Sequence, residues 1–376
     1  MSTRVRSPSL EIIDAAEAPT KRRKVEPDGD DSALQRMAPA ESGLGARSDD
    51  LWLDDGNMIL QAKGMSLRVH RSVLTLRSEV FKALLNPTAV AQLETFEGCP
   101  VLPVEDHGDD LHDILHIVYY GSNSHWMNAE RTPIPYADFR RVVYIAIKYQ
   151  IKEVMDEARH RLSQVFPTDA LSSWTISDTA HSAQLPVDVT YPDCIDVLHL
   201  ARLLHMPHIV PLVLYVCCIM DDPDLLVDGV AYAGGAERAA LAREDLRACL
   251  RGRAALVGEA AQTMRAFQAL AAGTAPLPAQ CTTRARCRQA LLLLGLAAVD
   301  DRLYSDPSAI DSMDVWLETK EAQPNARPCK HCGSHLREVI NKRREETWCK
   351  LGEIFGVQEW PAVKQLQQGD ETIVIA

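Results

Sequence analysis

The 376-residue sequence contains no run of 18 or more apolar residues, and Gly295 interrupts its longest apolar stretch, Ala290–Val299. A helix that spans a bilayer needs about 20 apolar residues, so the sequence predicts no membrane span. The N-terminus lacks an apolar segment of the kind found in secretory signals. Without export, we expect the ten cysteines to be reduced thiols, packing residues or metal ligands, and not disulfides.

The motifs of common enzyme classes are also missing. No G-x-S-x-G, P-loop or G-x-G-x-x-G occurs in a suitable context, and no pair of carboxylates stands out, so we expect a non-enzymatic protein. The formal net charge of −12 argues against binding to phosphate backbones, which requires a clustered basic face. The best candidate for a DNA-reading helix, Lys342-Arg343-Arg344, offers only three charges. Nucleic acid is therefore not an expected partner, although a DNA-binding regulator remains an alternative.

The segment from Trp52 to Asn86 changes from the periodicity of strands to that of helices. Residues 58–62 alternate between two faces, and residues 66–69 form a second short strand. The apolar spacing then becomes helical, and Ser78 is a suitable N-cap for a helix that buries Phe81. A strand hairpin followed at once by a helical hairpin predicts an α+β fold.

Three short motifs lie in or beside this segment: Asp55-Gly56-Asn57, Arg68-Val69-His70-Arg71-Ser72-Val73-Leu74 and Arg77-Ser78-Glu79-Val80-Phe81. Together they resemble the opening of a BTB/POZ domain. The resemblance marks Asp55, His70, Ser78 and Phe81 as structural positions. We expect the His70 ring to join strand and helix by hydrogen bonds, because no carboxylate or cysteine is patterned around it for catalysis or metal binding.

The following residues fit the remainder of such a domain. Helical periodicity predicts a helix at 109–121 and a pair of helices at 136–166 that is broken near Gln150. We therefore place the domain at residues 50–166. A mostly α-helical domain follows at 167–360, and a polar tail occupies 361–376.

A weak internal repeat relates Val143–Val154 to Val197–Val210, and it predicts a second helical hairpin stacked on the first. Three histidines in and near this second copy show no pattern of ligands around them, so we interpret His199, His205 and His208 as structural. We interpret Cys217 and Cys218, in an apolar run, as buried packing residues.

Residues 1–48 have the composition of a disordered tail. The tail carries the basic cluster Lys21, Arg22, Arg23 and Lys24, which resembles a monopartite nuclear localisation signal. A solvated charge cluster is the other interpretation. We expect the protein in the nucleus, with the cytoplasm as a second location.

Four cysteines suggest a metal site. Cys329 and Cys332 form a C-x-x-C motif, and Cys281 and Cys287 lie about forty residues upstream. This set predicts a structural zinc site, in which four protein ligands leave no position for catalytic water. His331, His335 or Cys349 can replace one ligand. Unmetallated thiols and a thioredoxin-like redox pair are the alternatives.

The resemblance extends beyond this domain. Further motifs lie at Trp52–Asn57, Glu94–Val104, Leu214–Cys218, Glu244–Ala254 and Trp348–Gly356, beside the two cysteine pairs. With them, residues 51–357 resemble BTB-domain proteins abundant in mushroom-forming fungi. This resemblance indicates the architecture better than the function. BTB domains bind proteins, either as homodimers in nuclear regulators or by docking cullin-3 in ubiquitin ligases. Dimeric regulators carry an amphipathic helix before the first strand, and Glu41–Asp50 has no apolar period. We therefore expect a nuclear scaffold or adaptor, with a cullin-3 substrate receptor as the alternative.

Overall fold

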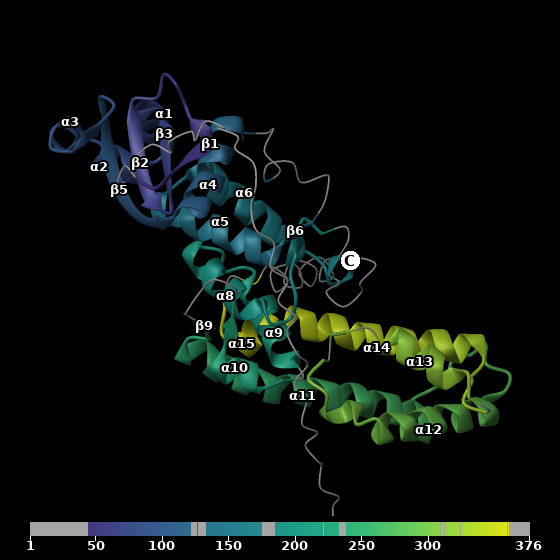
Figure 1. Ribbon diagram of the computed structural model, residues 1–376. Coiled ribbons are helices and arrows are strands. Elements are labelled where there is room, and N and C mark those ends of the chain that lie inside the picture. The colour runs from purple at the N-terminus through teal and green to yellow at the C-terminus, as the bar shows by residue number, and fades with distance from the viewer. Residues whose placement is uncertain are drawn as a thin grey trace, which may run out of the picture. The chain divides into compact units, whose positions relative to one another are not determined.

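The computed structural model describes residues 44–121, 126, 133–174, 185–220, 222–232, 238–308, 310–311, 313–323, 325–358 and 360. Contacts group them into one compact unit. A small sheet with helices comes first, and a mostly helical region follows (Figure 1). The basic cluster Lys21–Lys24 and the tail at 361–376 lie outside the described residues.

A mixed five-stranded sheet is built from β1 (Ala46–Trp52), β2 (Met58–Lys63), β3 (Met65–Val69), β4 (Thr95–Phe96) and β5 (Cys99–His107). The strand order is β1-β3-β2-β5-β4. Strand β2 lies at the centre, antiparallel to β3 and parallel to β5, so Leu60 lies between Leu67 and Leu102.

Strand β1 begins inside the segment that the sequence assigned to the tail, so residues 46–48 correct that boundary. The strand runs parallel to β3 and presents few apolar side chains, which is why no period reveals it. Its Ser48 Oγ accepts a hydrogen bond from Leu51 N at 3.1 Å, and Asp50 contacts His112 Nε2 at 2.7 Å. Backbone pairing and polar contacts therefore hold this strand.

The sheet buries apolar side chains on both faces, including one on the face opposite Met58, Leu60 and Ala62. Ile59, which alternation placed with polar neighbours, is fully buried. It packs in a small separate cluster with Leu44, Cys99 and Val101. These residues belong to distant segments, so alternation within one strand could not reveal their contact.

Six helices complete this part of the chain: α1 (Arg71–Arg77), α2 (Glu79–Leu84), α3 (Pro87–Val90), α4 (Gly108–Tyr120), α5 (Tyr136–Tyr149) and α6 (Lys152–Val165). The break near Gln150 confirms the predicted pair of helices. Pro87 is the first residue of α3, where its missing N–H costs no hydrogen bond, and Asn86 is the N-cap of that helix.

The internal repeat corresponds to two hairpins, α5–α6 and the pair α8 (Cys194–Leu203) and α9 (Val210–Ile219). Both turn at a residue with left-handed backbone, Gln150 with φ of 52° and His205 with φ of 55°. In both, the next amide donates to a carbonyl five residues back: Ile151 N to Ala146 O at 2.9 Å, and Met206 N to Ala201 O at 2.8 Å. The two hairpins thus share one helix-ending motif.

The later helices are α10 (Asp224–Asp228), α11 (Arg243–Ala272), α12 (Arg284–Asp300), α13 (Asp314–Glu321), α14 (Lys330–Cys349) and α15 (Leu351–Phe355). Helices α14 and α15 follow each other directly, with Lys350 as the single residue between them. Among the described residues, no helix is long and apolar enough to cross a membrane.

Short elements complete the described chain. Two 3₁₀ turns lie at Leu171–Ser173 and Leu303–Ser305. Two small ladders pair β6 (Ile134–Pro135) with β7 (Val187–Asp188), and β8 (Val230–Ala231) with β9 (Arg238–Ala239). The first ladder joins the segment before α5 to the segment before α8, which adds to the contact between the two hairpins.

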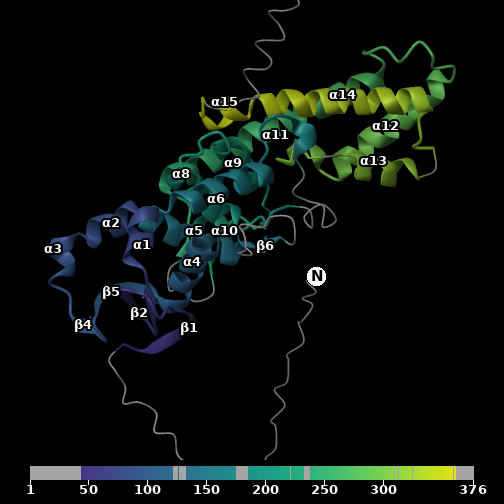
Figure 2. The ribbon, with the colours of Figure 1, turned by 90° about the horizontal axis from the view of Figure 1, so that it is seen from above.

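Two large apolar clusters organise these elements. The larger runs without interruption from the sheet and α4–α6 into α8, α9, the first part of α11 and α15. The smaller fills the space between the second part of α11, α12, α13 and α14, which lie side by side in Figures 1 and 2. The helical region therefore has a proximal part that shares its core with the sheet domain and a distal part with a core of its own.

Two glycines in α11 offer a direct test of this packing. A Cβ at Gly252 would clash with the Phe355 ring of α15, whereas a Cβ at Gly258 would meet no atom within 4 Å. We expect Gly252→Ala to lower the free energy of unfolding by about 1–3 kcal/mol, because the ring must move. Gly258→Ala is the matched control and should raise it by about 0.5–1 kcal/mol. Urea unfolding measures both, and equal effects would contradict the packing of α15 on α11.

Candidate functional site

The residues of the predicted signature lie at junctions of the sheet domain. The His70 ring was expected to join β3 to the helix that follows, and this expectation was wrong. The ring instead contacts Tyr119 Oη of α4 at 3.2 Å and Asp55 Oδ1 at 3.2 Å. The backbone N of His70 also donates to Tyr119 Oη at 2.7 Å. These contacts join α4, the end of β3 and the turn before β2.

Ser78 and Phe81 connect α2 to the α5–α6 hairpin. Ser78 Oγ accepts a hydrogen bond from Phe81 N at 3.0 Å, which confirms the predicted N-cap. The same hydroxyl donates to the carbonyl oxygen of Tyr149. The Phe81 ring stacks on Tyr149 with centroids 4.4 Å apart. These contacts give both residues a structural role.

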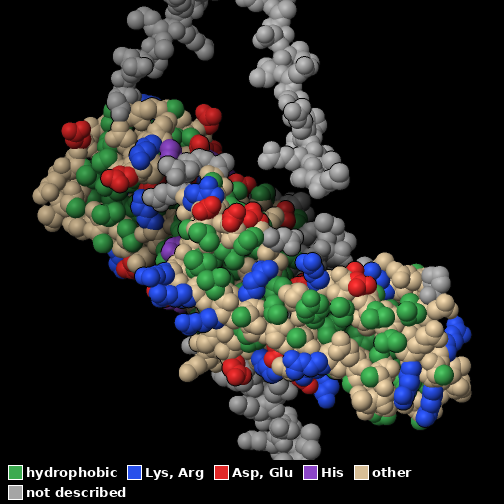
Figure 3. Space-filling view, turned by 90° about the horizontal axis from the view of Figure 1, so that it is seen from below, with side chains coloured by type: hydrophobic (Ala, Val, Ile, Leu, Met, Phe, Trp, Pro, Cys, Tyr) green, Lys and Arg blue, Asp and Glu red, His purple; other side chains and the backbone are tan. Residues whose placement is uncertain are grey.

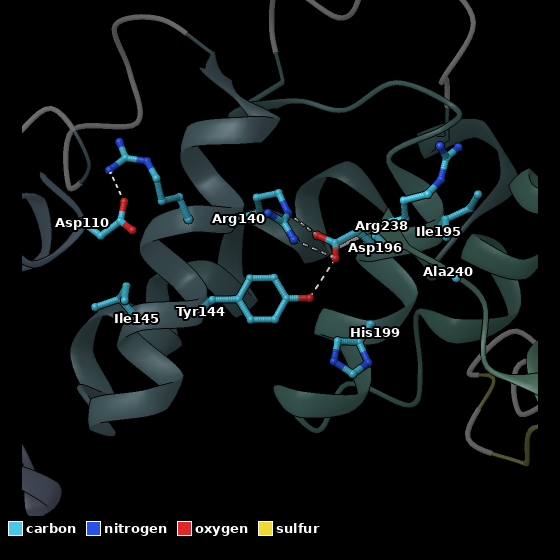
Figure 4. A pocket seen from close by; sticks show the side chains of 11 residues that line it. Asp110, Arg140, Tyr144, Ile145, Ile195, Asp196, His199, Arg238 and Ala240 are labelled. Carbon is cyan, nitrogen blue, oxygen red and sulfur yellow. Dashed lines mark hydrogen bonds and ion pairs between the residues drawn. The ribbon is translucent and has the colours of Figure 1, made fainter. Parts of the chain in front are cut away.

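A buried carboxylate that the sequence analysis missed joins the sheet domain to the helical region. Asp196 of α8 is 2% exposed and accepts hydrogen bonds from Tyr136 Oη, Tyr144 Oη and Arg140 Nε, each at 2.8 Å. The three donors are four residues apart along one side of α5. Figure 4 shows Arg140 and Tyr144 pointing at this carboxylate.

The surroundings keep the donors protonated. Burial, reinforced by the negative charge of Asp196, raises the pKa of the Tyr136 and Tyr144 hydroxyls. Burial alone would lower the pKa of Arg140, but its hydrogen bond to Asp196 raises it. The guanidinium also lies over the Tyr232 ring at 4.3 Å. Because every donor stays protonated, the buried carboxylate remains neutralised and fully hydrogen-bonded.

Beside this carboxylate lies an open cleft of about 480 Å³, lined by Asp110, Arg140, Arg141, Tyr144, Ile145, Ile195, Asp196, His199, Arg238, Ala239 and Ala240. Its arginines have partners within the protein. Arg141 pairs with Asp110 at 2.8 Å and with Asp113 at 2.7 Å. Arg238 donates to the carbonyls of Asp228 and Gly229, both at 2.7 Å. Helices α5 and α8 supply most of the lining of this cleft, and Arg141 and Arg238 at its edge are paired within the protein.

The four predicted cysteines come together in the distal part. The sulfurs of Cys281, Cys287, Cys329 and Cys332 all lie within 4.8 Å of one another. Tetrahedral zinc with bonds of about 2.3 Å places its sulfurs about 3.8 Å apart. The four thiols thus need only a small contraction to enclose such an ion, and the cluster can hold a metal.

Local structure favours a thiolate at Cys287 and disfavours one at Cys332, whose pKa is raised by burial and by hydrogen bonds with the neighbouring thiols. Cys287 lies in the first turn of α12, where the positive end of the helix dipole stabilises negative charge. The backbone N of Cys329 donates to Cys287 Sγ at 3.3 Å, and Thr283 Oγ1 lies 3.4 Å from the same sulfur. Burial raises the pKa of Cys287, but these hydrogen bonds outweigh it and lower the pKa to about 7.

The other candidate ligands lie outside this cluster. In the part of the chain that the structure describes, the metal-compatible group consists of the four cysteines, without His331, His335 or Cys349. His335 contacts Glu338 at 3.6 Å instead. All ten cysteines are free thiols. As predicted, Cys217 and Cys218 are buried in the larger core.

Two of the three basic side chains considered for DNA contact, Arg343 and Arg344, form hydrogen bonds within the protein. Arg343 donates to Gln262 Oε1 at 2.6 Å and pairs with Glu346 of its own helix. Arg344 Nε donates to the carbonyl oxygen of Ile310 at 2.7 Å. Both arginines hold α14 in place, so this helix offers a poor surface for reading bases.

The contribution of Asp196 can be measured. We expect Asp196→Ala to lower the free energy of unfolding by about 3 kcal/mol, because it leaves Arg140 and two tyrosine hydroxyls without their acceptor. Tyr144→Phe removes one donor and retains the ion pair, so it should cost about 1 kcal/mol. Urea unfolding of both variants checks this order, and similar losses would show that the carboxylate does not anchor α8 to α5.

Comparison with known proteins agrees with this architecture. Residues 54–165 match the family model described as BTB/POZ domain. The match spans β2–β5 and α1–α6, that is, the central strands of the sheet and the helices packed on it. A search of curated proteins finds no match to the chain. Residues 54–165 thus form a BTB/POZ domain, a protein-interaction module, and a mostly helical region follows it.

Proposed function

We propose that this protein is a non-catalytic scaffold or adaptor that binds protein partners through its BTB domain. The observation that supports the proposal most directly is the match of residues 54–165 to the BTB/POZ family. The core that the BTB domain shares with α8 and α9 also supports the proposal. It fixes the helical region to the BTB domain, so a partner bound to the BTB domain has a defined position relative to the helical region. The helical region takes the place of a separate substrate-binding module.

The BTB helices offer a surface for such a partner. Leu76 of α1 is 80% exposed and Leu84 of α2 is 45% exposed, whereas Leu74 and Phe81 of the same two helices are buried. Large apolar side chains that stay exposed on neighbouring helices are candidates for a binding surface. We propose that the α1–α2 hairpin contributes to partner binding.

Three finer hypotheses accompany this proposal. The partner is cullin-3 if the protein is a ubiquitin-ligase substrate receptor, and a second copy of the chain if the BTB domain homodimerises.

The basic cluster Lys21–Lys24 supports action in the nucleus. The resemblance of residues 51–357 to fungal BTB proteins would make the helical region a recurring companion of this domain. A DNA-binding role has less support, since Arg343 and Arg344 are engaged within the protein.

Affinity purification with mass spectrometry tests the interaction role. We expect the double variant Leu76→Glu, Leu84→Glu to reduce recovery of the principal partner at least about tenfold, because a charge in an apolar contact is strongly unfavourable. Val227→Glu, at a residue of α10 that is 67% exposed, is the matched control. Recovery of cullin-3 at native levels would favour the ligase alternative. Unchanged recovery with the double variant would exclude the α1–α2 surface.

We also propose that the four cysteines hold one structural zinc ion. Bound there, zinc would join the loop before α12, the start of α12 and the start of α14. The smaller core has few buried residues, so a closed four-sulfur site would add substantially to the stability of the distal part. Four protein ligands leave no position for a catalytic water.

Metal analysis of the purified chain provides the test. We expect about one zinc per chain, and loss of that zinc in Cys281→Ser, Cys287→Ser, Cys329→Ser and Cys332→Ser. Cys349→Ser is the control on the same helix as Cys332 and should retain the metal. Chelation should increase hydrogen exchange in α12 and α14 and leave the BTB sheet unchanged. Equal zinc content in all five variants would sink the proposal.

A further inference from the structure

Helix α12 is apolar on two opposite faces. Its inner face packs into the smaller core through Cys287, Ala290, Leu291, Leu294 and Ala298. Its outer face exposes Leu292 by 52%, Leu296 by 53% and Val299 by 42%. Figure 3 shows hydrophobic side chains gathered over the distal helices, with Lys and Arg side chains near the edge of the group. A helix with apolar side chains on two opposite faces is normally covered on both of them.

The spacing of the exposed residues is that of a helix-pairing seam. Leu292, Leu296 and Val299 follow one another at intervals of four and three residues, the repeat that keeps side chains facing a partner helix. The same repeat extends back to Gln289 and Ala285, both exposed. Leu293, 37% exposed, lies beside this line and widens the apolar face. The pattern therefore points to another helix as the element that covers this face.

The charges at the two ends of α12 select the partner. Its first turns carry the exposed Arg284, Arg286 and Arg288, and its end carries the exposed Asp300. Asp301 is engaged with Lys320 at 2.8 Å. A second α12 running parallel would set like charges together, whereas an antiparallel one would set arginines against the aspartate at both ends.

We propose that α12 is a homodimerisation helix, which packs antiparallel on α12 of a second copy of the chain. In a two-fold arrangement centred between Leu292 and Leu296, each of these leucines lies against the other in the second copy. Arg286 and Arg288 of one copy then lie at the level of Asp300 of its mate. The surface lies outside the BTB domain, so the proposal does not depend on the function proposed above.

Sedimentation velocity of the full chain over a range of concentrations tests this contact. One helix pair is smaller than a standard interface, so we expect a dissociation constant on the order of 10 µM. The double variant Leu292→Glu, Leu296→Glu should weaken association at least about tenfold. Leu250→Glu, at a residue of α11 that is 62% exposed, is the control and should leave association unchanged.

A charge exchange tests the direction of the helices. Asp300→Arg alone, or Arg286→Glu with Arg288→Glu, should weaken association severalfold, since the symmetric contact contains each pair twice. All three changes together should restore it. A chain that stays monomeric at every concentration would overturn the proposal. So would a Leu292/Leu296 variant that associates as strongly as the parent chain, because the exposed face of α12 would then contribute nothing, or a charge exchange without recovery.

Discussion

The buried carboxylate of Asp196 is the constraint on which the arrangement of the two parts of the chain depends. A charge at 2% exposure is tolerated only if every lone pair is used, and α5 supplies three donors spaced by one helical turn each. Sliding α8 along α5 by a single residue would break this set. Apolar packing alone tolerates such shifts, so the polar contacts fix how the second hairpin sits on the BTB domain.

Local patterns predicted much of this structure. The change of period after Val69 located the hairpins, and the C-x-x-C motif with Cys281 and Cys287 located the cluster, because each depends on neighbours in sequence or on a rare residue type. Parallel pairing of β1, burial of Ile59 and the role of Asp196 could not be predicted, since each depends on a partner far along the chain. An aspartate in the apolar helix sequence CIDVLHLARL was the one available signal.

The cysteine cluster supports the smaller apolar core, which contains few buried residues. Cys281 and Cys329 are separated by more than forty residues, and the helices between them enclose only a thin apolar layer. The four cysteine sulfurs bring the loop before α12 and the N-termini of α12 and α14 close together. The proximal part needs no such device, because it continues the core of the BTB domain. The two parts of the helical region are thus stabilised by different means.

The edge strand β1 has a consequence for solubility. It pairs with β3 on one side, and among the described residues no other strand lies on its second side. An open strand edge can recruit a strand from another molecule and start aggregation. Arg47, Asp49 and Asp50 are exposed along β1, and charges at such positions oppose that recruitment. The charged residues that hide the period of this strand in the sequence are therefore the ones that oppose pairing of its edge with other molecules.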